Sequence, residues 1–244
     1  MKAKIVRLGT PYFAGQPLFV DKPVYEEIPS IGDSILGKEL SWVQDGSLLV
    51  ATQCLCYGVS WEQLHEKGFI FGQPVQIDGK AYLCRSLKAG ATKDEPNEWD
   101  DLLNKFGRDN HLWNWKKIYF WGQETVIHSN LEYKVVRGSE ISRTWTYFNP
   151  KRDYVDVGFR PVLEPFSPVP SLTEAALGCR IKLYGPRGEM LTGILAGFDD
   201  YDVVLEEISF QPQPNAEGVP CDWLTMNTEN AVANRKAISL IQRI

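Results

Sequence analysis

Three prolines fall within the six residues Pro165-Phe166-Ser167-Pro168-Val169-Pro170, and this stretch limits the fold more than any other part of the sequence. Proline lacks a backbone N–H and fixes φ, so neither a helix nor a central strand can run through it. Such a composition favours an extended spacer. The 244 residues are enough for two modest domains. We therefore predict domains at residues 1–165 and 171–244, joined by a linker at residues 166–170.

The first domain is expected to be of the α+β class, with short strands and two helices. Asn97 is suited to cap a helix that ends at Phe106, and Ser60 to cap a shorter one through Glu66. The pair Asp78-Gly79 joins two strand-like runs, which is a strong hairpin signal. These signals place regular elements around loops that are rich in aromatic residues.

The segment from Leu131 to Pro165 contains the candidate binding residues. Two strand-like runs enclose a long polar loop, and loops on a rigid frame commonly carry binding chemistry. An Arg137-Gly138 pair, then Trp145, then Gly158-Phe159-Arg160 resembles the closing segment of the C-type lectin-like fold, as in formylglycine-generating-enzyme-like domains and in the variable proteins of diversity-generating retroelements. The predicted ligand-binding residues are Arg137, Ser139, Arg143, Trp145, Tyr147 and Asn149.

That resemblance implies a display scaffold, and with it a phage or mobile-element context, rather than an enzyme. Formylglycine-generating enzymes act through cysteines of their closing segment, and residues 131–165 contain none. We therefore expect a non-enzymatic module that binds a protein or carbohydrate ligand, with an enzyme on this scaffold as an alternative. We also expect Arg160 to brace the loop from Ser139 to Asp156 through hydrogen bonds to carbonyls or carboxylates, with Glu164 as a nearby acid.

The sequence of the second domain predicts one short helix followed by a strongly bent sheet. Gly193 and Gly197 lie inside the longest strand pattern, and glycine permits the bend that a small barrel needs. The prediction is an all-β, five-stranded barrel with an N-terminal helix. The expected helix is 171–177 and the expected strands are 180–184, 189–198, 201–206 and 236–241.

Two runs of this domain, one from Gly188 to Leu205 and one from Asn234 to Ser239, resemble the two motifs of the Sm-like family, closest to its bacterial Hfq type. The resemblance implies a homo-oligomer formed through strand edges. It also implies an alternative function, binding of single-stranded RNA through Tyr201, Arg235 and Lys236. The carboxylates beside Tyr201 reduce the attraction for a phosphate backbone.

Charge and composition exclude several other classes of protein. A net charge of -5 does not suit a protein that coats nucleic acid or an anionic membrane. No apolar run reaches the length of a membrane helix, and five cysteines without a repeated spacing do not form a secreted disulfide framework. We expect a cytoplasmic protein without a membrane partner. The histidines and acidic residues show no metal-ligand spacing, so neither a metal nor another cofactor is predicted.

Overall fold

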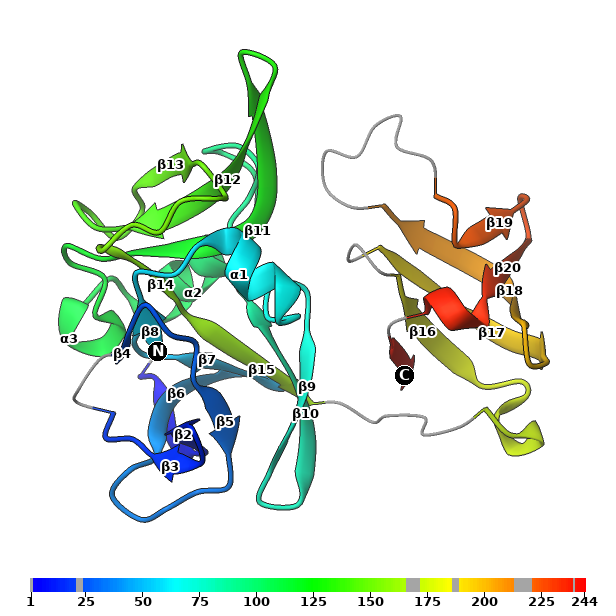
Figure 1. Ribbon diagram of the computed structural model, residues 1–244, viewed down its shortest axis with the longest axis horizontal. Coiled ribbons are helices and arrows are strands. Elements are labelled where there is room, and N and C mark those ends of the chain that lie inside the picture. The colour runs from blue at the N-terminus through cyan, green and yellow to red at the C-terminus, as the bar shows by residue number, and fades with distance from the viewer. Residues whose placement is uncertain (1, 21–23, 166–171, 186–188, 213–220, 239) are drawn as a thin grey trace. The chain divides into compact units, whose positions relative to one another are not determined.

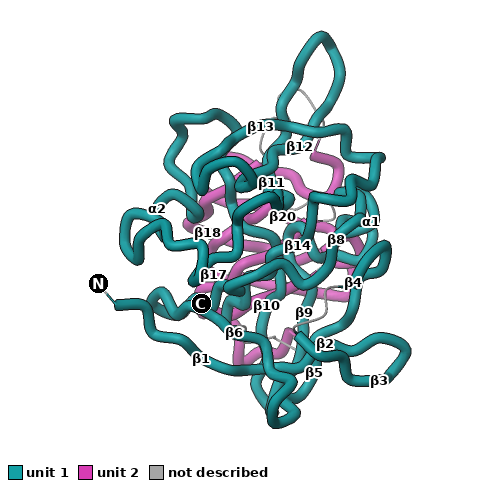
Figure 2. Tube along the Cα trace, turned by 90° about the vertical axis from the view of Figure 1, so that its left-hand side faces the viewer, with its two compact units in different colours: residues 1–165 teal, residues 166–244 magenta. Residues whose placement is uncertain are grey.

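A computed structural model describes residues 2–20, 24–165, 172–185, 189–212, 221–238 and 240–244 (Figure 1). The contacts between residues divide the chain into two compact units, residues 1–165 and residues 166–244, which Figure 2 colours separately. The predicted linker at residues 166–170 lies outside the described residues. None of the described helices is long and apolar enough to cross a membrane.

Two six-stranded sheets form most of the first unit (Figure 1). The first sheet has the order β1-β6-β7-β15-β10-β9, and its neighbouring strands are antiparallel. The Asp78-Gly79 hairpin is confirmed between β9 and β10, where both turn residues have positive φ. The strands are β1 (Lys4–Leu8), β6 (Leu40–Asp45), β7 (Leu48–Ala51), β9 (Gln73–Ile77), β10 (Lys80–Ser86) and β15 (Pro161–Pro165).

The second sheet has the order β13-β12-β11-β14-β8-β4 and carries the candidate binding residues. Its long hairpin, β11–β12, turns at Ser129 and Asn130 and extends well beyond β13 (Figure 1). The strands are β4 (Val24–Tyr25), β8 (Cys56–Tyr57), β11 (Tyr119–His128), β12 (Leu131–Gly138), β13 (Trp145–Phe148) and β14 (Val157–Phe159). A small third sheet joins β2 (Thr10–Phe13), β3 (Gln16–Pro17) and β5 (Ser30–Gly32).

Both predicted helices of the first unit are confirmed. In α1 (Trp61–Glu66), the Ser60 hydroxyl accepts from the Gln63 amide and the Gln63 side chain accepts from the Ser60 amide, which completes a capping box. In α2 (Glu98–Phe106), the Asn97 side chain accepts from the Asp100 amide. A further short helix, α3 (Asn110–Trp113), follows.

Aromatic residues fill the cores between these elements. Trp42, Trp61 and Trp121 are buried in one cluster, and Trp99 and Trp113 in another. Each of these indoles donates its N–H to a backbone carbonyl, so their burial leaves no indole unpaired. Trp145, in contrast to the fully buried Trp113 and Trp121, is partly exposed.

The second unit contains one six-stranded sheet of order β19-β20-β18-β17-β16-β21. Bulges in the β17–β18 ladder fall next to Gly193 and Gly197, which agrees with the role in bending expected for these glycines. The strands are β16 (Arg180–Tyr184), β17 (Met190–Phe198), β18 (Asp202–Gln211), β19 (Leu224–Met226), β20 (Asn230–Asn234) and β21 (Leu240–Arg243).

The predicted fold class is wrong for both parts of the chain. Strand makes up 49% of the described residues and helix 11%, so the chain is mostly β rather than α+β. In the described part of the second unit the sheet has two free ends, β19 and β21, and no closed five-stranded barrel is present. The expected N-terminal helix is a single 3-10 turn, η1 (Glu174–Ala176), without a side-chain cap. Where strand 236–241 was expected, a 3-10 turn, η2 (Arg235–Ala237), precedes β21.

Candidate functional site

The register of β12 and β13 decides which predicted ligand-binding residues lie together. Arg137 pairs with Trp145, and Val135 pairs with Tyr147, so these side chains share one face of the sheet. Lys134 pairs with Phe148 and lies on the opposite face. The segment from Ser139 to Asp156, expected to be a loop, therefore includes strand β13. The side chains of this strand point alternately to the two faces of the sheet.

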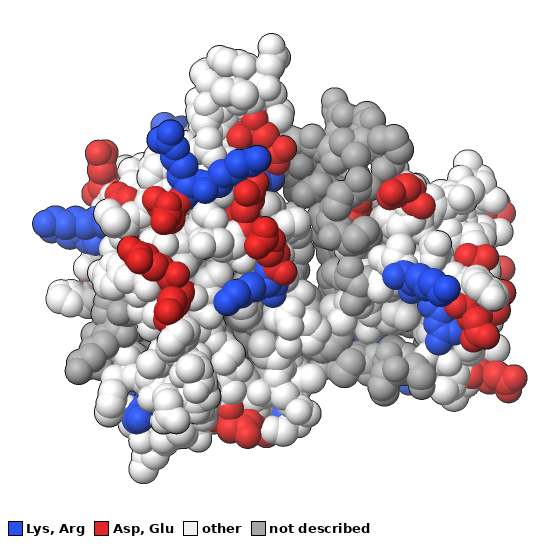
Figure 3. Space-filling view, viewed as in Figure 1, with Lys and Arg blue, Asp and Glu red and all other residues white. Residues whose placement is uncertain are grey.

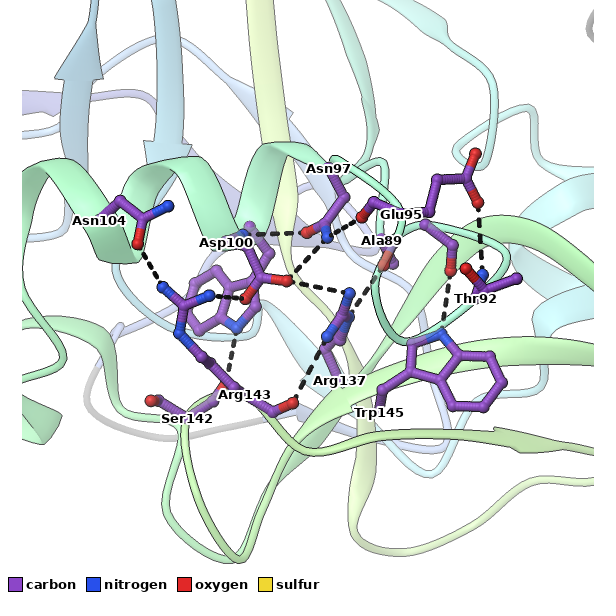
Figure 4. Close-up of polar contacts among 12 residues, drawn as sticks. Ala89, Thr92, Glu95, Asn97, Asp100, Asn104, Arg137, Ser142, Arg143 and Trp145 are labelled. Carbon is purple, nitrogen blue, oxygen red and sulfur yellow. Dashed lines mark hydrogen bonds and ion pairs between the residues drawn. The ribbon is translucent and has the colours of Figure 1, made fainter.

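Arg137 and Arg143 belong to a buried ionic network, not to an open binding surface (Figure 4). Asp100, in the first turn of α2, accepts from Arg143 Nη1 at 2.9 Å and lies 3.2 Å from Arg137 Nη2. Arg143 Nη2 also donates to Asn104. Because the Arg137 side chain is only 1% exposed, its charge depends on Asp100 for compensation. These contacts fasten α2 to the turn between β12 and β13.

Trp145 and Ser139 also form hydrogen bonds that hold neighbouring segments of the first unit in place. The Trp145 indole donates to the Gly90 carbonyl at 3.0 Å, and Arg137 Nε donates to the Ala89 carbonyl at 2.8 Å, so the segment before α2 is held against the sheet (Figure 4). Ser139 has a φ of 75° and its amide donates to the Trp115 carbonyl. These residues stabilise the loop geometry.

Tyr147 lies in an aromatic cluster at the outer part of the same face. Its ring centroid is 5.2 Å from Tyr133, 5.7 Å from His128 and 5.9 Å from Trp145. The rings are tilted or edge-on to one another, which is the arrangement that aromatic pairs prefer. They form a half-buried cluster in which each ring contacts its neighbours.

Arg160 does not brace the predicted loop. Its guanidinium is fully buried and donates to the carbonyls of Ala51 and Trp113. It lies beside the edge-on pair of Trp99 and Phe120, 5.2 Å and 5.0 Å from the two ring centroids. Glu164 is 3.2 Å from Arg85 instead. Arg160 therefore joins β7 to α3 across the core, because carbonyl oxygens of those segments face its position.

Asn149 is the predicted residue that borders a cavity. The cavity has a volume of about 490 Å³, within the range of small-molecule pockets, and opens between α1 and the outer part of β12. It is lined by Trp61, Glu62, His65, Leu131, Glu132, Tyr133, Lys134, Asn149, Pro150 and Lys151. Pro150 continues the wall, and its carbonyl accepts from the Glu62 amide, which ties this wall to α1.

A buried lysine contributes a fixed cation to this cavity. Lys134 is 3% exposed, and its Nζ donates to Thr125 at 2.7 Å and to Glu132 at 2.5 Å. The ammonium also lies 4.0 Å from the centroid of the Trp61 ring, in the geometry of a cation–π contact. Burial lowers the pKa of Lys134, while Glu132 opposes that change.

His65 also contacts the Trp61 ring. Its ring stacks on Trp61 with centroids 4.9 Å apart. Burial, and after it the charge of Lys134, lowers the pKa of His65. A neutral imidazole therefore accompanies the two carboxylates Glu62 and Glu132 and the two lysines Lys134 and Lys151. On the face of the first unit shown in Figure 3, acidic and basic side chains lie next to one another.

Sequence reasoning missed most of this cavity. The first of the two strand-like runs expected within Leu131 to Pro165 is present as β12. A lysine inside this mostly buried strand was the signal available in the sequence. Contact with α1 could not be inferred, because Trp61 and Lys134 are far apart in the sequence. Among the described residues, no group of three or more histidine, cysteine or acidic side chains is arranged to hold a metal ion.

The cysteines of the first unit are buried thiols. Burial raises the pKa of Cys54 to about 11, and it also raises the pKa of Cys56 and Cys84. Since the thiolate is the nucleophilic form, these side chains are poorly suited to covalent chemistry.

No family model, curated protein or solved structure matches this chain.

The three residues of the predicted RNA site do meet in the second unit. Tyr201 is 68% exposed, and Lys236 Nζ lies 5.7 Å from its ring centroid. The Arg235 amide donates to the Tyr201 carbonyl, and its guanidinium donates to the Asp199 carbonyl. Hydrogen bonds from the amides of Tyr201 and Asp202 lower the pKa of Asp199, so this carboxylate is ionised beside the tyrosine.

Proposed function

We propose that the first unit is a non-enzymatic module that binds a protein or carbohydrate ligand in the cavity between α1 and β12. The observation that carries this proposal is a preformed cavity of about 490 Å³ with hydrogen-bonding groups from three separate segments. Apolar walls with a few fixed polar groups are typical of binding sites. The ionic network of Asp100, Arg137 and Arg143 supports the strand that forms one wall.

The chemistry of the lining favours binding over covalent catalysis. Lys134 is held by Thr125, Glu132 and the Trp61 ring, so its ammonium is already engaged. The buried thiols lie elsewhere and remain protonated near neutral pH. Five free cysteines also fit a reducing compartment, and on that ground we propose a cytoplasmic protein.

The test is a screen of glycans and small fragments by NMR on the ¹⁵N-labelled protein. Ligands of the cavity are expected to shift the Trp61 indole resonance and the amides of Glu132 and Asn149. An Asn149→Trp variant, which places a large side chain at the cavity wall, is expected to lose these shifts, whereas an Arg152→Trp variant at an exposed site keeps them. Hits that bind both variants equally would place the site elsewhere and overturn the proposal.

We propose that the second unit assembles copies of the chain through its sheet edges. The backbone groups along the outer sides of β19 and β21 have no neighbouring strand among the described residues. Such edges pair readily with another chain. We further propose that the two units are distant relatives of the C-type lectin-like and Sm-like families, as the sequence runs described above suggest.

Binding of single-stranded RNA by the second unit is a second candidate function. It is favoured by one observation, the exposed Tyr201 ring with Lys236 and Arg235 beside it. A base can stack on such a ring while the cations contact phosphate. Fluorescence anisotropy with labelled oligo-A and oligo-U at low salt tests it, and binding should weaken in a Tyr201→Ala variant. Absence of binding by the wild type would eliminate this function.

A further inference from the structure

Strand β13 stops while its neighbour β12 continues. The β12–β13 register begins at Lys134–Phe148, so residues Leu131 to Tyr133 have no strand beside them on that side in the described chain. Pro150 lacks an N–H and could not extend the ladder. Figure 1 shows the β11–β12 hairpin projecting past the end of β13. This leaves a short free edge on β12.

The hairpin turn fixes which backbone groups face that edge. Ser129 and Asn130 have φ values of 50° and 61°, as in a two-residue type I′ turn. His128 and Leu131, which flank such a turn, form a hydrogen-bonded pair, and the next pair, Ile127 and Glu132, does not exchange hydrogen bonds. The N–H and C=O of Glu132 therefore point away from β11 and toward the free edge.

The cavity adjoins the free edge of β12. Leu131 to Lys134 line it on one side, Asn149 to Lys151 close it where β13 ends, and α1 lies across from them. The free edge of β12 is thus open to an incoming chain, and a side-chain pocket lies next to it. An edge together with an adjoining pocket is the arrangement that recognises extended peptides.

The exposed charges at the cavity favour a basic side chain. Glu132 is 56% exposed and Glu62 is 43% exposed, whereas Lys134 is almost completely buried against Glu132. Lys151 is the exposed cation, and its Nζ lies 3.9 Å from Glu62. Exposed pairs at such a distance contribute little, so an incoming cation can replace Lys151.

We propose that the first unit binds an extended peptide segment that pairs with β12 at Glu132 and places a lysine or arginine side chain between Glu62 and Glu132. This inference rests on the proposed function and selects a protein ligand over a carbohydrate. Backbone hydrogen bonds to Glu132 supply part of the affinity, and the two carboxylates set the preference for a basic residue.

The test uses the full chain and a blocked peptide, acetyl-Thr-Val-Thr-Arg-Thr-Val-Thr-amide. Titration followed by NMR should shift the Glu132 amide and the Trp61 indole. A peptide with glutamate in place of arginine, and one N-methylated at the arginine backbone nitrogen, should each bind about tenfold more weakly, which is the effect of one hydrogen bond or ion pair of about 1.4 kcal/mol.

Protein variants test the pocket independently of the peptide chemistry. Glu62→Gln and Glu132→Gln should weaken binding of the arginine peptide, and Lys151→Gln should strengthen it because a competing cation is removed. Glu66→Gln, on the same helix but outside the cavity lining, is the matched control and should change nothing.

The outcomes separate this inference from the proposed function. If the arginine peptide leaves the Glu132 amide unshifted, or if N-methylation has no effect, pairing with β12 is overturned while glycans or fragments can still bind the cavity. If neither peptide, glycan nor fragment shifts any resonance of the cavity lining, the proposed function fails as well.

Discussion

Arg160 shows how a single buried cation organises the first unit. Its guanidinium has no carboxylate partner in the described structure, and burial lowers its pKa, yet two carbonyls and two aromatic rings surround it. Such a group is costly to bury and costly to remove, because the oxygens that receive its hydrogen bonds would lose their donors.

Replacing Arg160 with alanine is expected to destabilise the first unit by about 3 kcal/mol, since two buried carbonyls lose their donors and a cavity forms. Urea unfolding followed by tryptophan fluorescence measures this, because seven of the eight tryptophans lie before residue 150. The exposed Arg152→Ala variant is the control and should stay within about 0.5 kcal/mol of the wild type. Equal stability of the two variants would contradict the assigned role.

The pKa of His65 offers a second measurement at the scale of the residue. Burial and the nearby Lys134 both lower it below the ordinary value of 6.5, so the unfolded chain binds more protons there than the folded one. Stability from this group is present above about pH 6.5 and is lost as the pH falls through the lowered pKa. NMR titration of the ring should show a Lys134→Met variant with a higher His65 pKa; an unchanged pKa would show that Lys134 does not act on it.

At the scale of elements, local signals were sufficient where one segment determines its own structure. Ser60, Asn97 and the Asp78-Gly79 pair act within a few residues, and the elements they predict are present. The class of the chain and the shape of the second sheet depend on pairing between distant segments. Strand β20, for example, pairs with β18 although β19 lies between them in the sequence. The cavity could not be predicted from short sequence patterns either, because its lining also comes from segments that are distant in the sequence.

Two glycines of β17 allow a matched comparison of what bends that strand. A Cβ on Gly193 would lie 2.7 Å from the Glu206 carbonyl oxygen, whereas one on Gly197 would meet nothing within 4 Å. Gly193→Ala is therefore expected to destabilise the second unit by about 2 kcal/mol, and Gly197→Ala to have little effect. Differential scanning calorimetry should show the change in the transition of this unit alone. Similar losses in both variants would mean that flexibility, not close approach, is required.

At the scale of the whole molecule, the two units differ in net charge, and each buries its own set of apolar side chains. The sequence has a net charge of about -1 through Pro170 and -4 from Ser171 onward, so most of the excess negative charge lies in the smaller part. Each unit has its own buried core: two clusters in the first, which include Trp121 and Trp99 respectively, and one in the second, which includes Leu191 and Leu205. This separation makes it practical to assign assembly and ligand binding to different parts of the chain.

If the second unit assembles copies through β19 and β21, the full chain should be an oligomer and residues 1–165 alone a monomer. Light scattering after size-exclusion chromatography measures both masses. Proline at Ile241, in β21, removes one edge donor and should shift the full chain toward the monomer, because a strand edge without its N–H pairs poorly. Ile241 also packs on the core, so Ile241→Val serves as the control for lost burial. A monomeric full chain, or an oligomer of residues 1–165, would refute assembly by the second unit, while leaving the cavity of the first unit to be judged by its own ligands.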